Sequence, residues 1–500
     1  MTGRGFFEQD NYKQMVVGNM KEQLVIGLDI GTTSAKAVLF RTNGSVVKEV
    51  EEELDTMYLS GKRAEQDPVE VDRKTRKALA ALMEGVEQTR IISGGFSAAM
   101  HSLIFVDGDG QAISNASIWS DAGSLESMDS IPMKEEIYAR TGTPIHPMTP
   151  LVKLHHHKKR RTDMFRRAEG VVSLKEYIIH NWFGDDLIDY SMASATGMYN
   201  LKEGKWDEKA LEVAGISERM LNRVSSPRTR LSPFKAGVAE EIGISETIPF
   251  YLGACDGQLA NLGDGAIRPG EAAISAGTSG AIRQFAHSPY VDDSRETFTY
   301  AFEKDSFIIG GPTNNGGIVL QWLKNVMNFD GSPDEFTELA EEIAPGAEGV
   351  LFIPHVNGER APVWDPEATG SFHHLGMRHG QAHFVRACLE GIAFNLYHIG
   401  HSVERISGRP EKIRMNGGLA KSRVFVKILA DVFGQDIELS ITHHSAAWGA
   451  AWVSLFGSGK VGSYEEIREY TPVGEIIRFN EENHRTYQEV FKKYRQLTGE

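Results

Sequence analysis

Two short glycine turns, each set between a pair of apolar strands, constrain the fold of this chain more than any other feature. The first lies in LVIGLDIGTTSAKAVLF, residues 24–40, and the second in EAAISAGTSGAIRQF, residues 271–285. Glycine lets an anion approach the backbone closely, and successive N–H groups in such a turn form an anion-binding nest. The repeated pattern predicts two α/β halves, each opening with the same turn, packed around a cleft.

The residue types in these turns favour the phosphates of a nucleotide as the ligand. Neither turn is a Walker A loop, and no GxGxxG follows a strand. Asp29, at the end of the first strand, is expected to hold Mg²⁺ through water. Lys36 is expected to reach a phosphate, unless it faces solvent on the outgoing strand. The predicted phosphate contacts are Gly31, Thr32, Thr33, Gly277, Thr278 and Ser279.

Between the two turns, YLGACDG presents Asp256 directly after a short apolar strand. A carboxylate beside a phosphate site can accept the proton of a substrate hydroxyl and orient it for in-line attack. We therefore predict that Asp256 is a general base and that Gly257 lies in the substrate site. The plainer alternative is a loop-capping aspartate.

Three further segments suggest where an acceptor and a nucleoside would lie. His101, in SAAMHS, is placed to hydrogen-bond sugar hydroxyls, although a lone histidine is more often a packed one. Trp119 and Asp121 offer an apolar plane and an acceptor, as polyol sites do. Gly417 and Gly418 follow a strand at a helix start, where a nucleoside could lie against the backbone. Each of these also fits an ordinary buried residue or turn.

Length and composition limit the remaining possibilities. The 500 residues predict about two large domains, and the net charge of −15 disfavours nucleic acid as a partner. Two cysteines, Cys255 and Cys388, and no apolar run of about 20 residues predict a cytoplasmic protein without a membrane span. The predicted division is an N-terminal extension over 1–22, domains over 23–264 and 265–460, and a C-terminal helical tail over 461–500.

Together and in this order, these segments resemble the FGGY family of carbohydrate kinases, within the actin/hexokinase/Hsp70 ATPase superfamily. The similarity runs from about residue 24 to 460. It implies two actin-like, ribonuclease H-like ATPase domains around a central cleft, ATP and Mg²⁺ as cofactors, and a homodimer, which is common in the family. It adds site residues that chemistry alone did not single out, namely Met100 for the substrate and Gly316, Gly317 and Ser422 for the nucleotide.

Within the family, the strings SAAMHSLI, GTSGAIR and GERAPVWDPEATGSF resemble gluconokinases. This resemblance implies phosphorylation of D-gluconate at its terminal hydroxyl, giving 6-phospho-D-gluconate. A cation should then meet the substrate carboxylate, and Lys175, Arg283 and His146 are the unranked candidates. Alternatives are a xylulokinase-like pentulose or polyol kinase, a non-catalytic sugar sensor, and a chaperone-like or filament ATPase.

Overall fold

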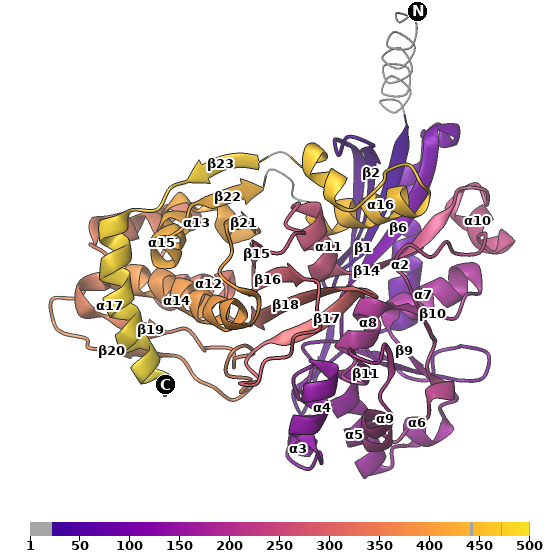
Figure 1. Cartoon of the computed structure of the whole chain (residues 1–500), viewed down its shortest axis with the longest axis horizontal. Coiled ribbons are helices and arrows are strands. Elements are labelled where there is room, and N and C mark those ends of the chain that lie inside the picture. The colour runs from indigo at the N-terminus through magenta and orange to yellow at the C-terminus, as the bar shows by residue number, and fades with distance from the viewer. Residues whose placement is uncertain (1–22, 441–443, 472, 500) are drawn as a thin grey trace, which may run out of the picture.

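The protein was analysed as a computed structural model, which describes residues 23–440, 444–471 and 473–499. The predicted N-terminal extension over 1–22 lies outside the described residues. Two sheets dominate the architecture, one of five strands and one of seven. They lie in separate α/β halves that meet at the centre of the molecule (Figure 1). No helix among the described residues is long and apolar enough to cross a membrane.

The first sheet has the strand order β14-β6-β1-β2-β3. Its central strand β1 pairs antiparallel with β2 and parallel with β6, and β14 runs parallel to β6. The bounds are β1 Leu24–Ile30, β2 Ser34–Arg41, β3 Val46–Glu53, β6 Ile91–Ala98 and β14 Phe250–Cys255.

The second sheet repeats this pairing pattern in its own strands. β15 pairs antiparallel with β16 and parallel with β21, and β22 runs parallel to β21. β18 and β17 extend the β16 side, and β23 extends the other. The bounds are β15 Glu271–Ala276, β16 Gly280–Ala286, β17 Phe298–Glu303, β18 Ser306–Thr313, β21 Lys412–Asn416, β22 Ile437–Ser440 and β23 Val473–Ile477. The predicted pair of like halves is therefore confirmed.

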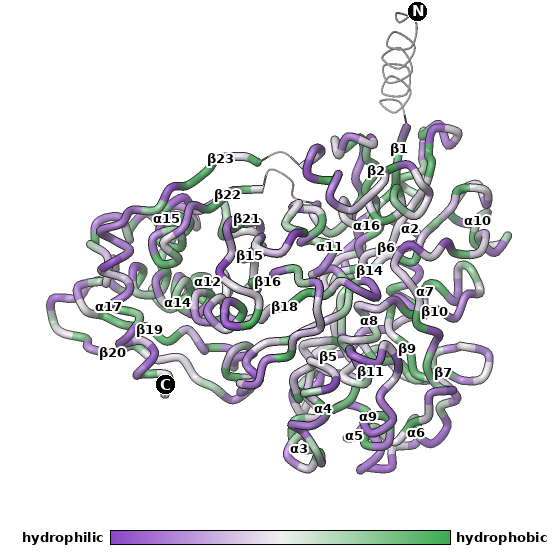
Figure 2. Tube along the Cα trace, viewed as in Figure 1, coloured by the Kyte–Doolittle hydropathy of each residue, from purple (hydrophilic) through white to green (hydrophobic). Residues whose placement is uncertain are grey.

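Strand β1 is almost continuously apolar because helices cover both of its faces. Leu24, Ile26 and Leu28 pack into the core beneath α2 (Pro68–Met83) and α7 (Leu174–Phe183). Val25, on the opposite face, packs with α16 (Ser445–Gly457) and α11 (Asp256–Gly263). Figure 2 shows hydrophilic colouring on outer helices such as α6 (Asp163–Arg167) and α17 (Glu481–Leu497).

Helix α16 comes from the C-terminal part of the chain but lies against the first sheet (Figure 1). It can approach because glycines face it: a Cβ at Gly27 or Gly95 would overlap carbonyl oxygens of α16. α16 therefore falls within the predicted domain over 265–460 but packs against the sheet of the predicted domain over 23–264. The predicted helical tail also contributes a strand, since β23 pairs with β22.

Smaller elements complete both halves. The segment between β6 and β14 adds α3 (Leu125–Met128), α4 (Lys134–Thr141), α5 (Pro150–Arg160), α8 (Tyr190–Ala195), α9 (Glu208–Ala214) and α10 (Ala236–Ile242). The second half is built on α14 (Gln381–Ser407), with α12 (Gly317–Val326), α13 (Pro333–Glu338) and α15 (Arg423–Phe433). Buried apolar side chains of α14 and α15 form a large part of its core, together with residues of the sheet and of α17.

Candidate active site

A cavity of about 380 Å³ lies where the two halves meet, and residues from both sheets line it. It brings together both glycine turns, the segment after β6, and Asp256 at the start of α11. The lining residues are Thr32, Thr33, Ala99, Met100, His101, Trp119, Asp256, Ser275, Gly277, Thr278, Ser279, Gly280, Ala281, Arg283, Phe298, Tyr300, Pro312 and Arg360. Segments far apart in the sequence thus form one site.

The first turn is fixed by hydrogen bonds from its surroundings. The N–H of Gly31 donates to the carbonyl of Ser34 at 2.9 Å, which closes the turn between β1 and β2. The indole N–H of Trp119 donates to Oγ1 of Thr32 at 2.8 Å. Asp29, one strand position before the turn, is partly buried and accepts a hydrogen bond from Ser97 Oγ at 2.7 Å. Burial raises the pKa of Asp29.

The second turn rests on the N-terminus of α12. The N–H of Gly317 donates to the carbonyl of Gly277 at 2.7 Å, and the N–H of Ile318 donates to Thr278 at 3.1 Å. A Cβ at Gly316 would lie 2.6 Å from the carbonyl oxygen of Ser279. Glycine is needed here because the helix start and the turn touch through their backbones. Gly316 and Gly317 therefore support the turn and are not among the residues that line the cavity.

Asp256 follows the buried strand β14 and begins α11. Its Oδ1 accepts a hydrogen bond from the N–H of Gly257 at 2.6 Å. Burial, together with the nearby Asp29 carboxylate, raises the pKa of Asp256 to about 6, while Arg283 and Arg360 act in the opposite direction. A carboxylate with such a pKa is ionised at neutral pH and is a stronger base than an ordinary aspartate.

Met100 and His101 follow the end of β6 and face the same cavity. His101 has a positive φ of 69°, a conformation uncommon for residues other than glycine. Its Nδ1 lies 2.9 Å from the carbonyl of Ala195, so Nδ1 carries the proton and Nε2 is left as an acceptor. Burial lowers the pKa of His101 to about 3, which keeps the ring neutral.

Lys153, which sequence reasoning missed, braces this region from behind. Its Nζ donates to the carbonyls of His101 at 2.8 Å, Ser117 at 3.1 Å and Ile118 at 2.7 Å. These three hydrogen bonds hold the backbone segments that carry His101 and Trp119. Nothing in the spacing of α5 marked Lys153 as different from its basic neighbours, because its role depends on tertiary packing.

Two arginines add positive charge to the cavity. Arg283 projects from β16, and its buried Nε and Nη1 atoms have no hydrogen-bond partner among the described residues. Arg360 donates from Nη2 to the carbonyl of Thr313 at 3.1 Å, and its guanidinium lies 4.8 Å from the centre of the Trp119 ring. Arg360 was not among the site residues predicted from the sequence, although it lies in the GERAPVWDPEATGSF string of the family resemblance.

Several predicted site residues are not among those that line this cavity. Lys175 forms a buried ion pair with Asp189 at 2.8 Å, and Lys36 pairs with Glu51 at 3.4 Å on the sheet. Asp121 lines an adjoining cavity of about 330 Å³ and accepts a hydrogen bond from the N–H of Gly123. His146 Nδ1 accepts from the N–H of Met148, and its ring contacts Trp364. The charges on both lysines are thus already matched by carboxylates.

The predicted nucleoside residues lie between the end of β21 and the start of α15. Gly417 has φ 96°, and a Cβ there would lie 2.5 Å from the carbonyl oxygen of Ala276. At Gly418 a Cβ would meet no atom within 4 Å. Ser422 caps α15 and accepts from the N–H of Phe425 at 3.4 Å. Gly417 thus lies against the end of strand β15, and none of the three residues is among those that line the cavity.

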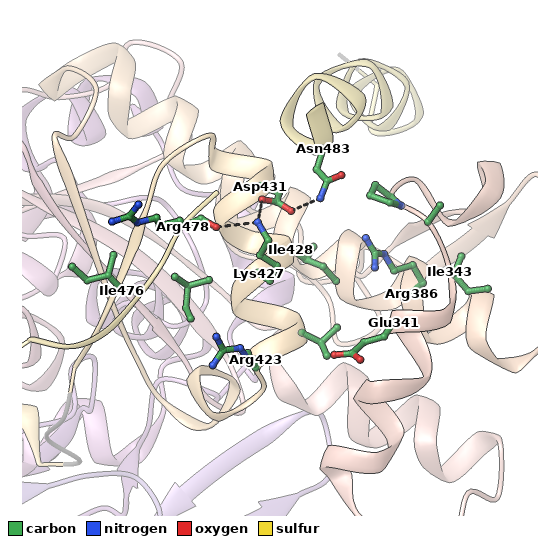
Figure 3. Close-up of a pocket in the computed structure, with 14 residues that line it drawn as sticks. Glu341, Ile343, Arg386, Arg423, Lys427, Ile428, Asp431, Ile476, Arg478 and Asn483 are labelled. Atoms are coloured by element: carbon green, nitrogen blue, oxygen red, sulfur yellow. Dashed lines mark hydrogen bonds and ion pairs between the residues drawn. The ribbon is translucent and has the colours of Figure 1, made fainter. Parts of the chain in front are cut away.

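A larger cavity, of about 720 Å³, lies away from both turns and is shown in Figure 3. It is lined by α15, β23 and their neighbours. Its charged side chains are largely matched: Arg386 pairs with Glu390, Arg423 with Glu475 and Lys427 with Asp431. This matching leaves little uncompensated charge to attract an ionic ligand, in contrast to the cavity around Asp256.

No cluster of three or more histidine, cysteine or acidic side chains suited to a metal occurs in the described part of the chain. Mg²⁺ is commonly held by one or two carboxylates together with waters and substrate phosphates, so a single carboxylate beside the turns is enough to fit it. Asp29 meets this requirement by position, close to the first turn and to Asp256.

Comparison with known proteins agrees with this geometry. Residues 24–263 match the N-terminal domain of the FGGY family of carbohydrate kinases, and residues 272–457 match its C-terminal domain. The gluconokinase of Bacillus subtilis (strain 168) is 37% identical, covering 95% of this chain and 94% of that protein. Crystal structures described as a gluconate kinase and a ligand-bound xylulose kinase, both from Lactobacillus acidophilus, each superpose with a TM-score of 0.92. Each is 31% identical, covering 95% of this chain and 97% of the other. The chain therefore belongs to the FGGY family of carbohydrate kinases.

Proposed function

We propose that this carbohydrate kinase transfers the γ-phosphoryl group of ATP to the terminal hydroxyl of D-gluconate, giving 6-phospho-D-gluconate. The observation that carries the proposal is the placement of Asp256 in one cavity with both glycine turns and an unpaired arginine. The turns suit phosphates, the carboxylate suits a proton acceptor, and the guanidinium suits an anionic acceptor. The 37% identity to a gluconokinase supports this choice of substrate.

In this proposal each half of the molecule supplies one part of the chemistry. Thr32 and Thr33 on one side, and Gly277, Thr278 and Ser279 on the other, hold the phosphates of ATP. The acceptor lies against Met100, His101 and Trp119, with the neutral Nε2 of His101 accepting a hydrogen bond from a sugar hydroxyl. Asp256 takes the proton from the attacking hydroxyl, and Gly257 closes that side of the site.

Asp29 is the proposed carboxylate for Mg²⁺, through water. The ion would neutralise charge on the β- and γ-phosphates of the nucleotide. Gly316 and Gly317 keep the second turn in place, and Gly417, Gly418 and Ser422 lie where a nucleoside would be expected beside β15. Closure of the two halves would then exclude water from the γ-phosphate and limit its hydrolysis.

We also propose that the protein is cytoplasmic and forms a homodimer. Cys255 and Cys388 are both buried free thiols, which suits a reducing cytoplasm. A homodimer is proposed on the family resemblance alone.

A second candidate function is phosphorylation of a neutral pentulose such as xylulose. The observation in its favour is the equal structural likeness to the xylulose kinase and to the gluconate kinase of Lactobacillus acidophilus. Arg283, whose guanidinium has unpaired donors in the cavity, favours a sugar acid as the substrate, because a neutral sugar would leave the guanidinium without an anion.

The test is release of ADP by the purified protein with Mg²⁺ and ATP across a panel of acceptors. D-gluconate, D-xylulose, L-ribulose and glycerol are compared with a reaction that contains no acceptor. Strong dependence on D-gluconate supports the proposal. Turnover with D-xylulose alone would transfer the assignment to the second candidate, and turnover without any acceptor would favour an ATPase.

A further inference from the structure

We propose that Arg283 binds the carboxylate of the acceptor and is the residue that makes the site prefer a sugar acid to a neutral sugar. This inference rests on the proposed function and names the residue that sets its substrate class. The sequence left Arg283, Lys175 and His146 unranked for this role. The structure separates them by their surroundings: Lys175 is paired with Asp189, and His146 is not among the residues that line the cavity. Burial also lowers the pKa of His146 to about 3, so that its ring is neutral.

Arg283 is a half-buried cation held in the middle of a sheet. It lies in the middle of β16, opposite Ala273 of β15 and Gly310 of β18, so both neighbouring strands cover its backbone. Its guanidinium packs against the start of α11, since a Cβ at Gly257 would lie 2.9 Å from Nη2. Among the described residues, Nε and Nη1 are buried and have no hydrogen-bond partner.

A buried guanidinium without a partner is costly, so a native structure that keeps one needs a compensating anion. Asp256 acts on Arg283 electrostatically but forms no ion pair with it in the described chain. The guanidinium is planar and presents parallel N–H donors, which match the two oxygens of a carboxylate. Because Arg283 also lines the cavity, the missing anion is expected to arrive with the substrate.

The other cations near the site are engaged in whole or in part. Lys175 is paired with Asp189, and Lys153 donates to three backbone carbonyls. Arg360 donates from Nη2 to Thr313 and faces the ring of Trp119, and its buried Nε has no hydrogen-bond partner among the described residues. Burial lowers the pKa of Arg360 to about 10, while the charge of the neighbouring Glu359 acts in the opposite direction. Arg283 is thus the cavity cation with the most unused donor capacity.

The rival role for Arg283 is stabilisation of the transferred phosphoryl group, because Asp256 is close. The two roles predict different kinetics. A carboxylate ligand affects only acceptors that carry a carboxylate, whereas a phosphoryl ligand affects every acceptor and also the slow hydrolysis of ATP. D-gluconamide, which replaces the carboxylate by an amide of nearly the same shape, separates them.

The experiment measures kcat/KM for D-gluconate and for D-gluconamide with wild-type protein, Arg283→Met and Arg283→Lys. We expect the wild type to prefer D-gluconate by about 100-fold or more, and Arg283→Met to reduce that preference to within about threefold. The preference should fall because kcat/KM is reduced much more for D-gluconate than for D-gluconamide, while the KM for ATP stays nearly constant. Arg283 also lowers the pKa of Asp256, so a smaller loss common to both acceptors is expected. Arg283→Lys should recover part of the preference, because a charge returns without the bidentate geometry.

Arg268→Met, at an exposed position just before β15, is the matched control and should behave as the wild type does. Equal loss of both acceptors in Arg283→Met would overturn the inference in favour of the phosphoryl role. A preference that persists in Arg283→Met but disappears in Arg360→Met would also overturn it. Folding is checked by thermal unfolding without ligand, where Arg283→Met should unfold at the wild-type temperature or above it, since an unpaired buried charge has been removed.

Failure of this inference and failure of the proposed function give different results. If wild-type protein phosphorylates D-xylulose and not D-gluconate, the proposed function is wrong. If wild-type protein phosphorylates D-gluconate and Arg283→Met keeps the full preference over D-gluconamide, the function stands and only the role of Arg283 is wrong. Binding of D-gluconate, followed as a rise in thermal stability, should occur in wild-type protein and be lost in Arg283→Met.

Discussion

Replacing Asp256 by asparagine should make the protein inactive and, at the same time, more stable. Burial raises the pKa of this carboxyl from its ordinary 3.8 to about 6. The folded protein therefore binds the proton more tightly than the unfolded chain does, and the ionised carboxylate lowers the free energy of unfolding. The loss of free energy of unfolding begins near pH 3.8, grows as the pH rises, and is complete above about pH 6.

The size of the effect follows from the shift. About two pKa units correspond to about 3 kcal/mol at about pH 7.5, and to about 1.6 kcal/mol at about pH 5, where both states are partly protonated. Asparagine keeps the shape and cannot ionise, so Asp256→Asn should gain these amounts in the free energy of unfolding. Its turnover should fall about 100- to 10,000-fold, the usual contribution of a general base.

The assay is urea unfolding followed by tryptophan fluorescence at the two pH values, with Asp109→Asn as a control. Asp109 is exposed on a loop, so its replacement should change stability by no more than about 0.5 kcal/mol. An Asp256→Asn protein that is no more stable than wild type at about pH 7.5 would refute the electrostatic argument. A gain of the same size at both pH values would refute it as well.

Three further predictions concern the kinetics of the wild type and of two variants. With Asp256 as the base, kcat/KM for the acceptor should fall about tenfold per unit of pH below about 6, and a flat pH profile down to about pH 5 would contradict that role. Lys153→Met removes the donor that holds the carbonyl of His101, so the KM for the acceptor should rise about tenfold while the KM for ATP stays constant. An unchanged acceptor KM would show that the brace is dispensable. Gly316→Ala places a Cβ 2.6 Å from a carbonyl of the second turn and should raise the KM for ATP at least about tenfold, in contrast to Gly237→Ala, where a Cβ meets nothing within 4 Å. Equal ATP affinity in the two alanine variants would argue against a role for the second turn in phosphate binding.

The parts of the site that could be predicted from the sequence are those formed by short, continuous segments. A strand, a glycine turn and a second strand are local features, and both turns lie in the cavity as expected. Asp256 was predictable for the same reason, because it directly follows an apolar strand.

The parts that could not be predicted depend on contacts between distant residues. Lys175 was a reasonable anion ligand until the fold brought Asp189 within 2.8 Å of it. Arg360 and Lys153 enter the site through a loop and a helix whose positions no local pattern encodes. The packing of α16 against the first sheet could not be predicted either. The small residues of α16 indicate only a helix, and the glycines that face it, Gly27 and Gly95, lie far away in the sequence in β1 and β6.

The central claim is that a phosphoryl group passes from ATP to the terminal oxygen of a sugar acid. The most direct test is ³¹P NMR of a reaction that contains the protein, ATP, Mg²⁺ and D-gluconate. We expect a new phosphate-ester signal split by the two protons of C6, formed in equal amount with ADP and absent with Asp256→Asn. ADP that appears only with inorganic phosphate, or an ester that forms with D-xylulose and not with D-gluconate, would contradict the account.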